Sequence, residues 1–247
     1  TELVKALPLE RRRLLRDKIF NSPNAPVSYP FLWDIPHHDF VQWNGIGANA
    51  GVGPVGRNTG EVIGVFGTLE WKEKPGWSLY SFLGGQGASK THISFQSSVN
   101  VHNLLQLEDR IWKLQSPRWE EVAKLGLVDA VDSKSAARGQ KLFNQHCAKC
   151  HAEIERDSPT RRIVANMDSL KEARTDPTMA SNSVDYSGYS GILRNMYMKA
   201  GVGSVLLNTK APVAAILTVA TQNVVATPSP DKAYFTLFGD WAVELIN

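Results

Sequence analysis

The sequence lacks the charge pattern of a nucleic-acid-binding protein and the long apolar run of a membrane span. Its net charge is only +3, and no run of Lys and Arg is longer than residues 11–13, whereas nucleic-acid binding usually needs clustered cations. The most apolar stretch, residues 211–226, is interrupted by polar residues such as Thr221 and Asn223 and is shorter than the roughly 20 residues of a membrane span. We therefore expect neither nucleic-acid binding nor a transmembrane segment, and we expect 211–226 to form a buried helix.

Cysteine is almost absent, because Cys147 and Cys150 are the only two in 247 residues. A structural zinc site needs four ligands, and no second cysteine pair or downstream histidine pair supplies them. His146 and His151 bracket the thiols, but four ligands within one hexapeptide can hardly close a tetrahedron. The scarcity of cysteine thus argues against zinc.

The two cysteines belong to the pentapeptide Cys-Ala-Lys-Cys-His at residues 147–151, which is the attachment pattern of a c-type haem. Each thiol can add to a vinyl group of the porphyrin as a thioether, and His151 is then placed to bind the iron as proximal ligand. A thioredoxin-like dithiol is the second interpretation, but it gives no reason for the adjacent imidazole. The motif predicts one covalent haem c on this chain.

The sequence pattern predicts a mainly α fold of cytochrome c type, with long irregular loops and at most short strands. We expect a loop-rich region with helices over 1–130 and the haem domain over 131–247, the latter incomplete at its C-terminus. Helices are expected over 1–20, 99–116, 119–125, 135–146 and 192–200. The glycine-rich run at 45–56 does not predict a dinucleotide site, because no apolar strand precedes it and Pro54 was expected to break a following helix.

Several segments together carry a family resemblance. They are Tyr-Pro-Phe-Leu-Trp-Asp-Ile-Pro-His-His-Asp-Phe-Val-Gln-Trp-Asn-Gly at 29–45, Glu-Val-Ile-Gly-Val-Phe-Gly at 61–67, Ala-Ala-Arg-Gly at 136–139 before the haem motif, and Thr-Asp-Pro at 175–177. In order and spacing they resemble the di-haem cytochrome c peroxidase superfamily, and the RoxA-type rubber oxygenases within it.

The resemblance implies two c-type haems, one that meets peroxide or dioxygen and one that passes electrons. The motif of this chain matches the second, C-terminal haem, so a second haem is expected in a longer protein. The first haem motif and the later His-Asn-Gly segment of the family are absent from these residues. By the same resemblance, Trp43 is a candidate for electron transfer and Phe66 for the border of a reactive pocket, although both are also plausible core residues.

The sixth iron ligand decides between electron transfer and binding of an oxidant. Met196 and Met198 are the distal candidates, with Met167 and Met179 closer to the motif. The other histidines are alternatives, although a structural role is the simpler interpretation for His102; they are His37, His38, His92, His102 and His146. Arg57 is a candidate partner of a haem propionate, because guanidinium binds carboxylates in a bidentate manner.

Two functions remain open from the sequence. The first is a di-haem peroxidase-like or oxygenase-like oxidoreductase, acting on peroxide, dioxygen or an organic substrate, in which the haem of this chain transfers electrons. The second is a single-haem electron carrier or a cytochrome subunit of a larger complex. Both need an electron-donor or electron-acceptor redox protein, and the first adds a second haem domain. Without an initiating Met or a signal peptide, we expect a processed chain, and covalent haem attachment predicts a periplasmic or secreted location.

Overall fold

The chain forms an assembly of short helices and hairpins in a computed structural model that describes residues 6, 8–10, 12–13, 22–25, 28–29, 31–42, 45, 47–51, 53–87, 90–151, 153–199 and 204–227. The helices in these ranges are η1 (Ile35–His37), α3 (Gly53–Val65), α4 (Leu79–Leu83), α5 (Val101–Ile111), α6 (Trp119–Lys124), α7 (Ser133–His146), α8 (Leu170–Ala173), α9 (Thr178–Asp185), η2 (Gly191–Leu193) and α10 (Val213–Ala226). The strands are β1 (Phe40–Val41), β2 (Gly47–Ala48), β3 (Leu69–Pro75), β4 (Thr91–Ser97), β5 (Ser187–Tyr189), β6 (Tyr197–Lys199), β7 (Ser204–Leu206) and β8 (Lys210–Pro212).

The expected mainly α fold of cytochrome c type is wrong. The strands of the described ranges form four antiparallel two-stranded sheets, β1–β2, β3–β4, β5–β8 and β6–β7, which lie between the helices. The β3–β4 hairpin is the largest and places Trp71 opposite Phe95, with ring centroids 6.0 Å apart in an edge-on arrangement. Such cross-strand aromatic pairs stabilise a hairpin, and a helix-period search does not detect them.

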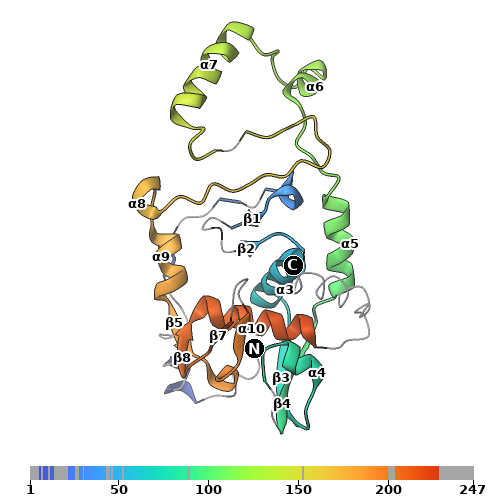
Figure 1. The fold of residues 1–247 in the computed structure, drawn as a ribbon, viewed down its shortest axis with the longest axis vertical. Coiled ribbons are helices and arrows are strands. Elements are labelled where there is room, and N and C mark those ends of the chain that lie inside the picture. The colour runs from blue at the N-terminus through green and yellow to red at the C-terminus, as the bar shows by residue number, and fades with distance from the viewer. Residues whose placement is uncertain are drawn as a thin grey trace.

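The hydrophobic core lies around α10, where Figure 1 shows α3 and the β3–β4 hairpin close by. Val219 and Val224 of α10 are fully buried and pack with Val55, Phe95 and Val101. Gly60 of α3 lies close to Thr221, so an added Cβ would come within 3.2 Å of the hydroxyl. The core therefore combines residues from both sides of position 130, and the division near that position stays a prediction.

One buried side chain of α10 is polar and fully hydrogen-bonded. Asn223 is 1% exposed, and its amide donates to the Gly84 carbonyl at 2.9 Å while its Oδ1 accepts from Gln86 at 2.7 Å. Gln86 in turn pairs with both backbone groups of Ile93. These bonds join α10 to the turn after α4 and to β4. They also give the buried polar groups the partners that such groups need.

Several of the expected helices are confirmed. The bounds of α6, α7 and α10 lie within two residues of the expected ranges, and α5 lies inside its expected range but ends five residues early, at Ile111. The helix expected over 192–200 is wrong, because η2 and β6 occupy that stretch. The effect expected of Pro54 is also wrong: Pro54 lies in the first turn of α3, where a missing backbone N–H interrupts no helical hydrogen bond. Of the helix expected over 1–20, only isolated residues are described.

Helices α6 and α7 lie at one end of the molecule, apart from the core (Figure 1). No described residue between Val101 and Arg161 is buried. No other described element comes within 4 Å of the place where a Cβ on Gly139 of α7 would lie. We call residues 117–160 the α6–α7 lobe, and its helices lack a hydrophobic core of their own.

A buried ion pair fixes the start of the next segment. Arg161 donates to Asp34 Oδ1 at 2.5 Å, and the two side chains are 2% and 5% exposed. Ser116 donates to the other carboxylate oxygen at 2.7 Å, and the Arg161 guanidinium also reaches Gln115 at 3.0 Å. This Asp34–Arg161 clasp joins three chain segments where they meet below the lobe.

Backbone hydrogen bonds extend the clasp along the chain. Ile163 donates to the His37 carbonyl at 2.8 Å, and Asp39 donates to the Ile163 carbonyl at 3.1 Å. Ala165 donates to the Asp39 carboxylate at 2.8 Å. Residues 161–165 are therefore held along 34–39, and this arrangement sets where the chain enters the segment that follows.

Replacing Asp34 by Asn is expected to lower the free energy of unfolding by about 3 kcal/mol at pH 7, because it leaves the Arg161 charge buried without its counter-ion. Burial disfavours the charged form of Asp34, but the hydrogen bonds from Ser116 and the ion pair with Arg161 outweigh it and hold the pKa of Asp34 below its ordinary value. The stabilisation is thus present above the unfolded-state pKa of about 4 and is lost as the pH falls through the lower folded-state pKa.

Urea unfolding of both proteins between pH 7 and pH 3 measures this difference. The matched control is Asp109→Asn, an exposed carboxylate on α5, for which a change within about 0.5 kcal/mol is expected. A loss below about 1 kcal/mol in the Asp34 variant at pH 7 would mean that the clasp contributes little.

Candidate functional site

The pentapeptide at residues 147–151 forms a tight turn at the end of α7. Cys147 and Ala148 both donate to the Phe143 carbonyl, at 2.7 and 2.9 Å, which ends the helix. Cys150 and His151 then donate to the Cys147 carbonyl at 3.0 and 2.9 Å. The two thiols and the imidazole are thereby carried on one turn, as a shared ligand would require.

Both thiols are free, and the site is open to solvent. Cys147 is half-buried, whereas Cys150 and the imidazole of His151 are exposed. Among the described residues, none covers Cys150 or His151 and so keeps a prosthetic group away from them. The arrangement therefore leaves the chemistry of thioether formation and iron ligation accessible.

The segment after the clasp packs against this turn. Asn166 donates to the Lys149 carbonyl at 3.2 Å, and the carboxylate of Asp168 accepts a hydrogen bond from the Cys150 thiol. On the other side, Gln140 of α7 donates to Glu153 at 3.1 Å. The turn is thus held between α7 and residues 166–168.

Asp168 also changes the acidity of the thiol it contacts. The hydrogen bond to its carboxylate, with some burial and the negative charge, raises the pKa of Cys150 above the ordinary thiol value. A raised pKa leaves less thiolate at neutral pH, and the thiolate is the form that reacts with disulfides and alkylating agents. Asp168 therefore favours the protonated thiol form of Cys150 over the thiolate.

Apolar side chains of the α6–α7 lobe are left uncovered. Leu125 and Leu127 are 74% and 72% exposed, and Leu142 of α7 is 51% exposed. Uncovered apolar groups of this size are unfavourable in water, at roughly 25 cal/mol for each Å². Leu142 lies in the last turns of α7, just before the cysteines, so a flat apolar group attached at the turn would find an exposed apolar side chain close by.

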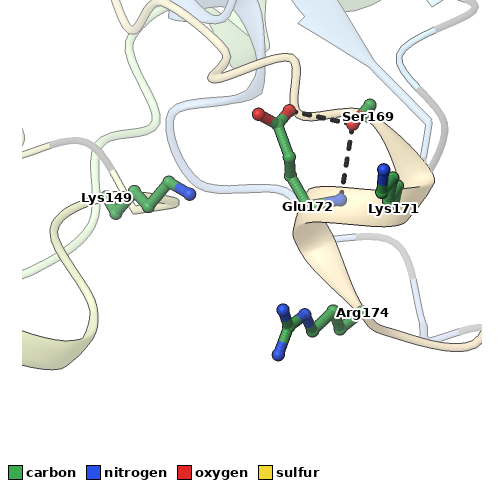
Figure 2. Close-up of a pocket in the computed structure, with 5 residues that line it drawn as sticks. All are labelled: Lys149, Ser169, Lys171, Glu172 and Arg174. Carbon is green, nitrogen blue, oxygen red and sulfur yellow. Dashed lines mark hydrogen bonds between the residues drawn. The ribbon is translucent and has the colours of Figure 1, made fainter.

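An open hollow of about 710 Å³ lies beside the turn. Lys149 forms one wall, and the other is formed by α8 and its neighbours Ser169 and Arg174. Figure 2 shows the ammonium of Lys149 directed towards α8, with the Arg174 guanidinium on the near side. The carboxylate of Glu172 is turned to the Ser169 hydroxyl, at 2.8 Å. Cations thus dominate the walls.

Of the two aromatic candidates and Arg57, the structure describes Phe66 and Arg57, and neither lines this site. Trp43 is outside the described residues. Phe66 follows the last turn of α3 and is 78% exposed. Arg57 forms an ion pair with Glu108 of α5 at 2.9 Å, so its guanidinium joins α3 to α5. Their expected roles at a haem stay predictions.

The methionine candidates for the distal position are also elsewhere. Met196 is 3% exposed within the core, with its sulfur 3.9 Å from the Asn223 amide, and Met198 packs against the same core. Met167 is next to the residues that contact the turn, but its side chain lies against Gly45. The described structure brings none of the three to His151.

The histidine candidates have separate surroundings. His37 is buried against Trp112, with ring centroids 4.5 Å apart, and neither of its ring nitrogens has a hydrogen-bond partner. His92 contacts the Gly76 carbonyl at 2.8 Å, and His102 contacts Gln106 at 2.9 Å along α5. Burial lowers the pKa of His38, against the opposing effect of nearby carboxylates.

Sequence reasoning missed the residues that position the turn. Asp34 and Arg161 are 127 positions apart, and single polar residues such as Asn166 and Asp168 carry no motif. Lys149 was visible inside the pentapeptide, but its hollow depends on α8, which only the folded chain brings near. An alternating pattern over 166–168 gives a weak signal, because alternate side chains of an extended segment share a face.

No group of three His, Cys, Asp or Glu side chains in the described ranges is arranged to hold a bare metal ion. This observation concerns metal sites in which protein side chains supply every ligand. A haem brings four nitrogen ligands of its own and needs a single axial side chain from the protein. The turn at 147–151 supplies one imidazole and two thiols, which is the donor set that haem c uses.

Comparisons with known proteins give one distant relative. No family model matches the chain, and no solved structure matches it. An uncharacterized protein of Sinorhizobium fredii, y4iJ, is 26% identical over 151 residues, which cover 56% of this chain and 21% of the relative. The chain thus spans about a fifth of the length of this curated relative, whose name assigns no activity.

None of the helices in the described ranges combines the length and the apolar character needed to cross a membrane.

Replacing Asp168 by Asn is expected to make Cys150 react faster with iodoacetamide in reduced, haem-free protein. The neutral amide no longer stabilises the protonated thiol, so the pKa of Cys150 falls towards its ordinary value and the thiolate fraction rises. Peptide mass spectrometry after alkylation at several pH values measures the rate at each cysteine.

Cys147 in the same protein is the internal control, and its rate is expected to change less. Asp176→Asn is the control variant, since this exposed carboxylate contacts Thr178 instead. If the dependence of the Cys150 alkylation rate on pH were unchanged in the Asp168 variant, the carboxylate would not influence the thiol.

Proposed function

We propose that this chain carries one haem c, bound through Cys147 and Cys150 with His151 as proximal iron ligand, and that this haem transfers electrons within a larger oxidoreductase. The observation that carries the proposal is the single turn that holds two free thiols and an exposed imidazole. Its spacing is the one that haem c attachment uses.

The state of the α6–α7 lobe supports the same proposal. Its described residues include none that is buried, and large apolar side chains such as Leu125, Leu127 and Leu142 are exposed. Small protein units that cannot bury enough apolar surface usually rely on a metal, a cofactor or a disulfide. A bound porphyrin would supply one-electron redox chemistry, and the chain would supply its attachment and its axial imidazole.

The larger protein is proposed to be a di-haem peroxidase-like or oxygenase-like oxidoreductase. The segments at 29–45 and 61–67 that resemble this superfamily support it, and the relative in Sinorhizobium fredii is much longer than this chain. A periplasmic or secreted location accompanies covalent haem attachment in bacteria. The competing function, a single-haem electron carrier, is favoured by the solitary CxxCH motif of these 247 residues.

Haem attachment is tested by expressing the full-length protein together with a c-type haem maturation system. Intact-mass analysis of denatured protein is expected to show covalent porphyrin on the 147–151 peptide, and Cys147→Ala with Cys150→Ala to remove it. His151→Ala is expected to retain porphyrin through the thioethers and to change the absorption spectrum, because it removes the axial ligand.

The matched control is His146→Ala, an exposed histidine on the other side of Cys147, for which porphyrin content and spectrum are expected to be unchanged. Wild-type protein that is colourless and free of porphyrin mass would refute the proposal. If both histidine variants changed the absorption spectrum equally, the assignment of His151 as the proximal ligand would be refuted, while haem attachment would stand.

The two candidate functions predict different haem counts in the full-length gene product. The di-haem enzyme is expected to carry two covalent haems and to change its spectrum when peroxide is added, because one iron has an open position. The carrier is expected to carry one low-spin haem that is inert to peroxide. Intact mass and an absorption titration with hydrogen peroxide decide between them.

A further inference from the structure

The hollow between Lys149 and α8 has an excess of positive charge. Three cations line it, Lys149, Lys171 and Arg174, against the single carboxylate of Glu172. That carboxylate accepts a hydrogen bond from Ser169 at 2.8 Å, and the Ser169 hydroxyl also accepts from the Glu172 backbone at 3.3 Å. Figure 2 shows the Glu172 carboxylate engaged within its own turn; it keeps its negative charge, so the three cations leave the hollow with an excess of positive charge.

The hollow adjoins the redox group of the proposed function. Lys149 lies between the two cysteines that would bind the porphyrin, and its carbonyl is held by Asn166 at 3.2 Å. A molecule seated on the hollow would therefore contact the attachment turn itself. Electron transfer is favoured by this closeness, because no other folded element needs to intervene.

Exposed apolar side chains border the cations. Leu170 of α8 is 47% exposed, and Met167 on the adjoining segment is 63% exposed. Protein interfaces commonly surround an apolar contact with a polar rim, and oppositely charged surfaces increase the rate of encounter. The hollow is wide and open, a shape suited to another protein surface.

We propose that this basic hollow is the docking surface for an acidic redox protein that exchanges one electron with the haem of this chain. The inference rests on the proposed haem at Cys147 and Cys150 and adds the place and charge of its partner. The transfer moves one electron between the partner's redox centre and the iron, with no bond made or broken. Redox proteins that meet in this way usually bury a small interface area, and their association weakens as the salt concentration rises.

The test measures electron transfer from a reduced, acidic plant-type ferredoxin to the oxidised, full-length haem protein by stopped flow. This donor has a potential near −400 mV, so reduction of the haem is favourable. The variant is Lys171→Glu with Arg174→Glu, which leaves the attachment motif intact. We expect the second-order rate constant at low ionic strength to fall about tenfold.

Wild-type protein is expected to react more slowly as salt rises to about 0.15 M, where screening acts beyond about 8 Å, and the double variant is expected to lose this dependence. Lys74→Glu is the matched control, an exposed cation on β3, and it is expected to behave as wild type. The milder Lys171→Gln is a second variant, with an expected fall of about two- to threefold from the loss of one charge.

A double variant that reacts like wild type, or a control that slows equally, would overturn the docking surface. Oxidation of the reduced protein by hexacyanoferrate(III) tests whether the cations attract any small anion. If the double variant reacts more slowly with this ion but at the wild-type rate with ferredoxin, the proposal is overturned. Haem absorbance is recorded before each experiment, so an absence of haem in wild-type protein is recognised separately as failure of the proposed function.

Discussion

The ion pair between Asp34 and Arg161 is the constraint on which the position of the candidate site depends. It brings together segments that are 127 positions apart in the chain, and it holds the 161–165 segment along 34–39. A few residues later Asn166 and Asp168 reach the turn that carries the cysteines. A buried pair of this kind costs desolvation, so its value lies in fixing one arrangement of the chain as much as in stability.

The molecule has two regions with different sources of order. The region around α10 has a packed core in which Val219 and Val224 are fully buried and Asn223 has its hydrogen bonds satisfied. The α6–α7 lobe has no such core, although its helices are clearly specified by their end residues. Asp132, for example, accepts from the Ser135 backbone at 2.8 Å at the start of α7. A lobe with capped helices and uncovered leucines is suited to pack around a prosthetic group.

Local rules predicted α6, α7 and α10 closely, but they missed α3, placed a helix wrongly at 192–200 and did not give the sheets. α7 and α10 follow from their end residues and apolar spacing, and each lies close to its expected range. The β5–β8 sheet was missed because its strands have three residues each and are separated along the chain by η2, β6 and β7. Pro54 shows the limit of a residue-level rule, since the same proline that breaks a helix interior is tolerated in the first turn of α3.

The sequence by itself determined the chemistry available at 147–151, because two thiols and an imidazole at that spacing form a local unit whatever surrounds them. Only the tertiary structure decided what lies around that unit: Asp168 beside Cys150, the cations of α8 beside Lys149, and Met196 in the core instead of near the motif. The physical reason is that thioether and ligand geometry depend on a few adjacent residues. Burial, charge and access depend on segments that meet only when the whole chain folds.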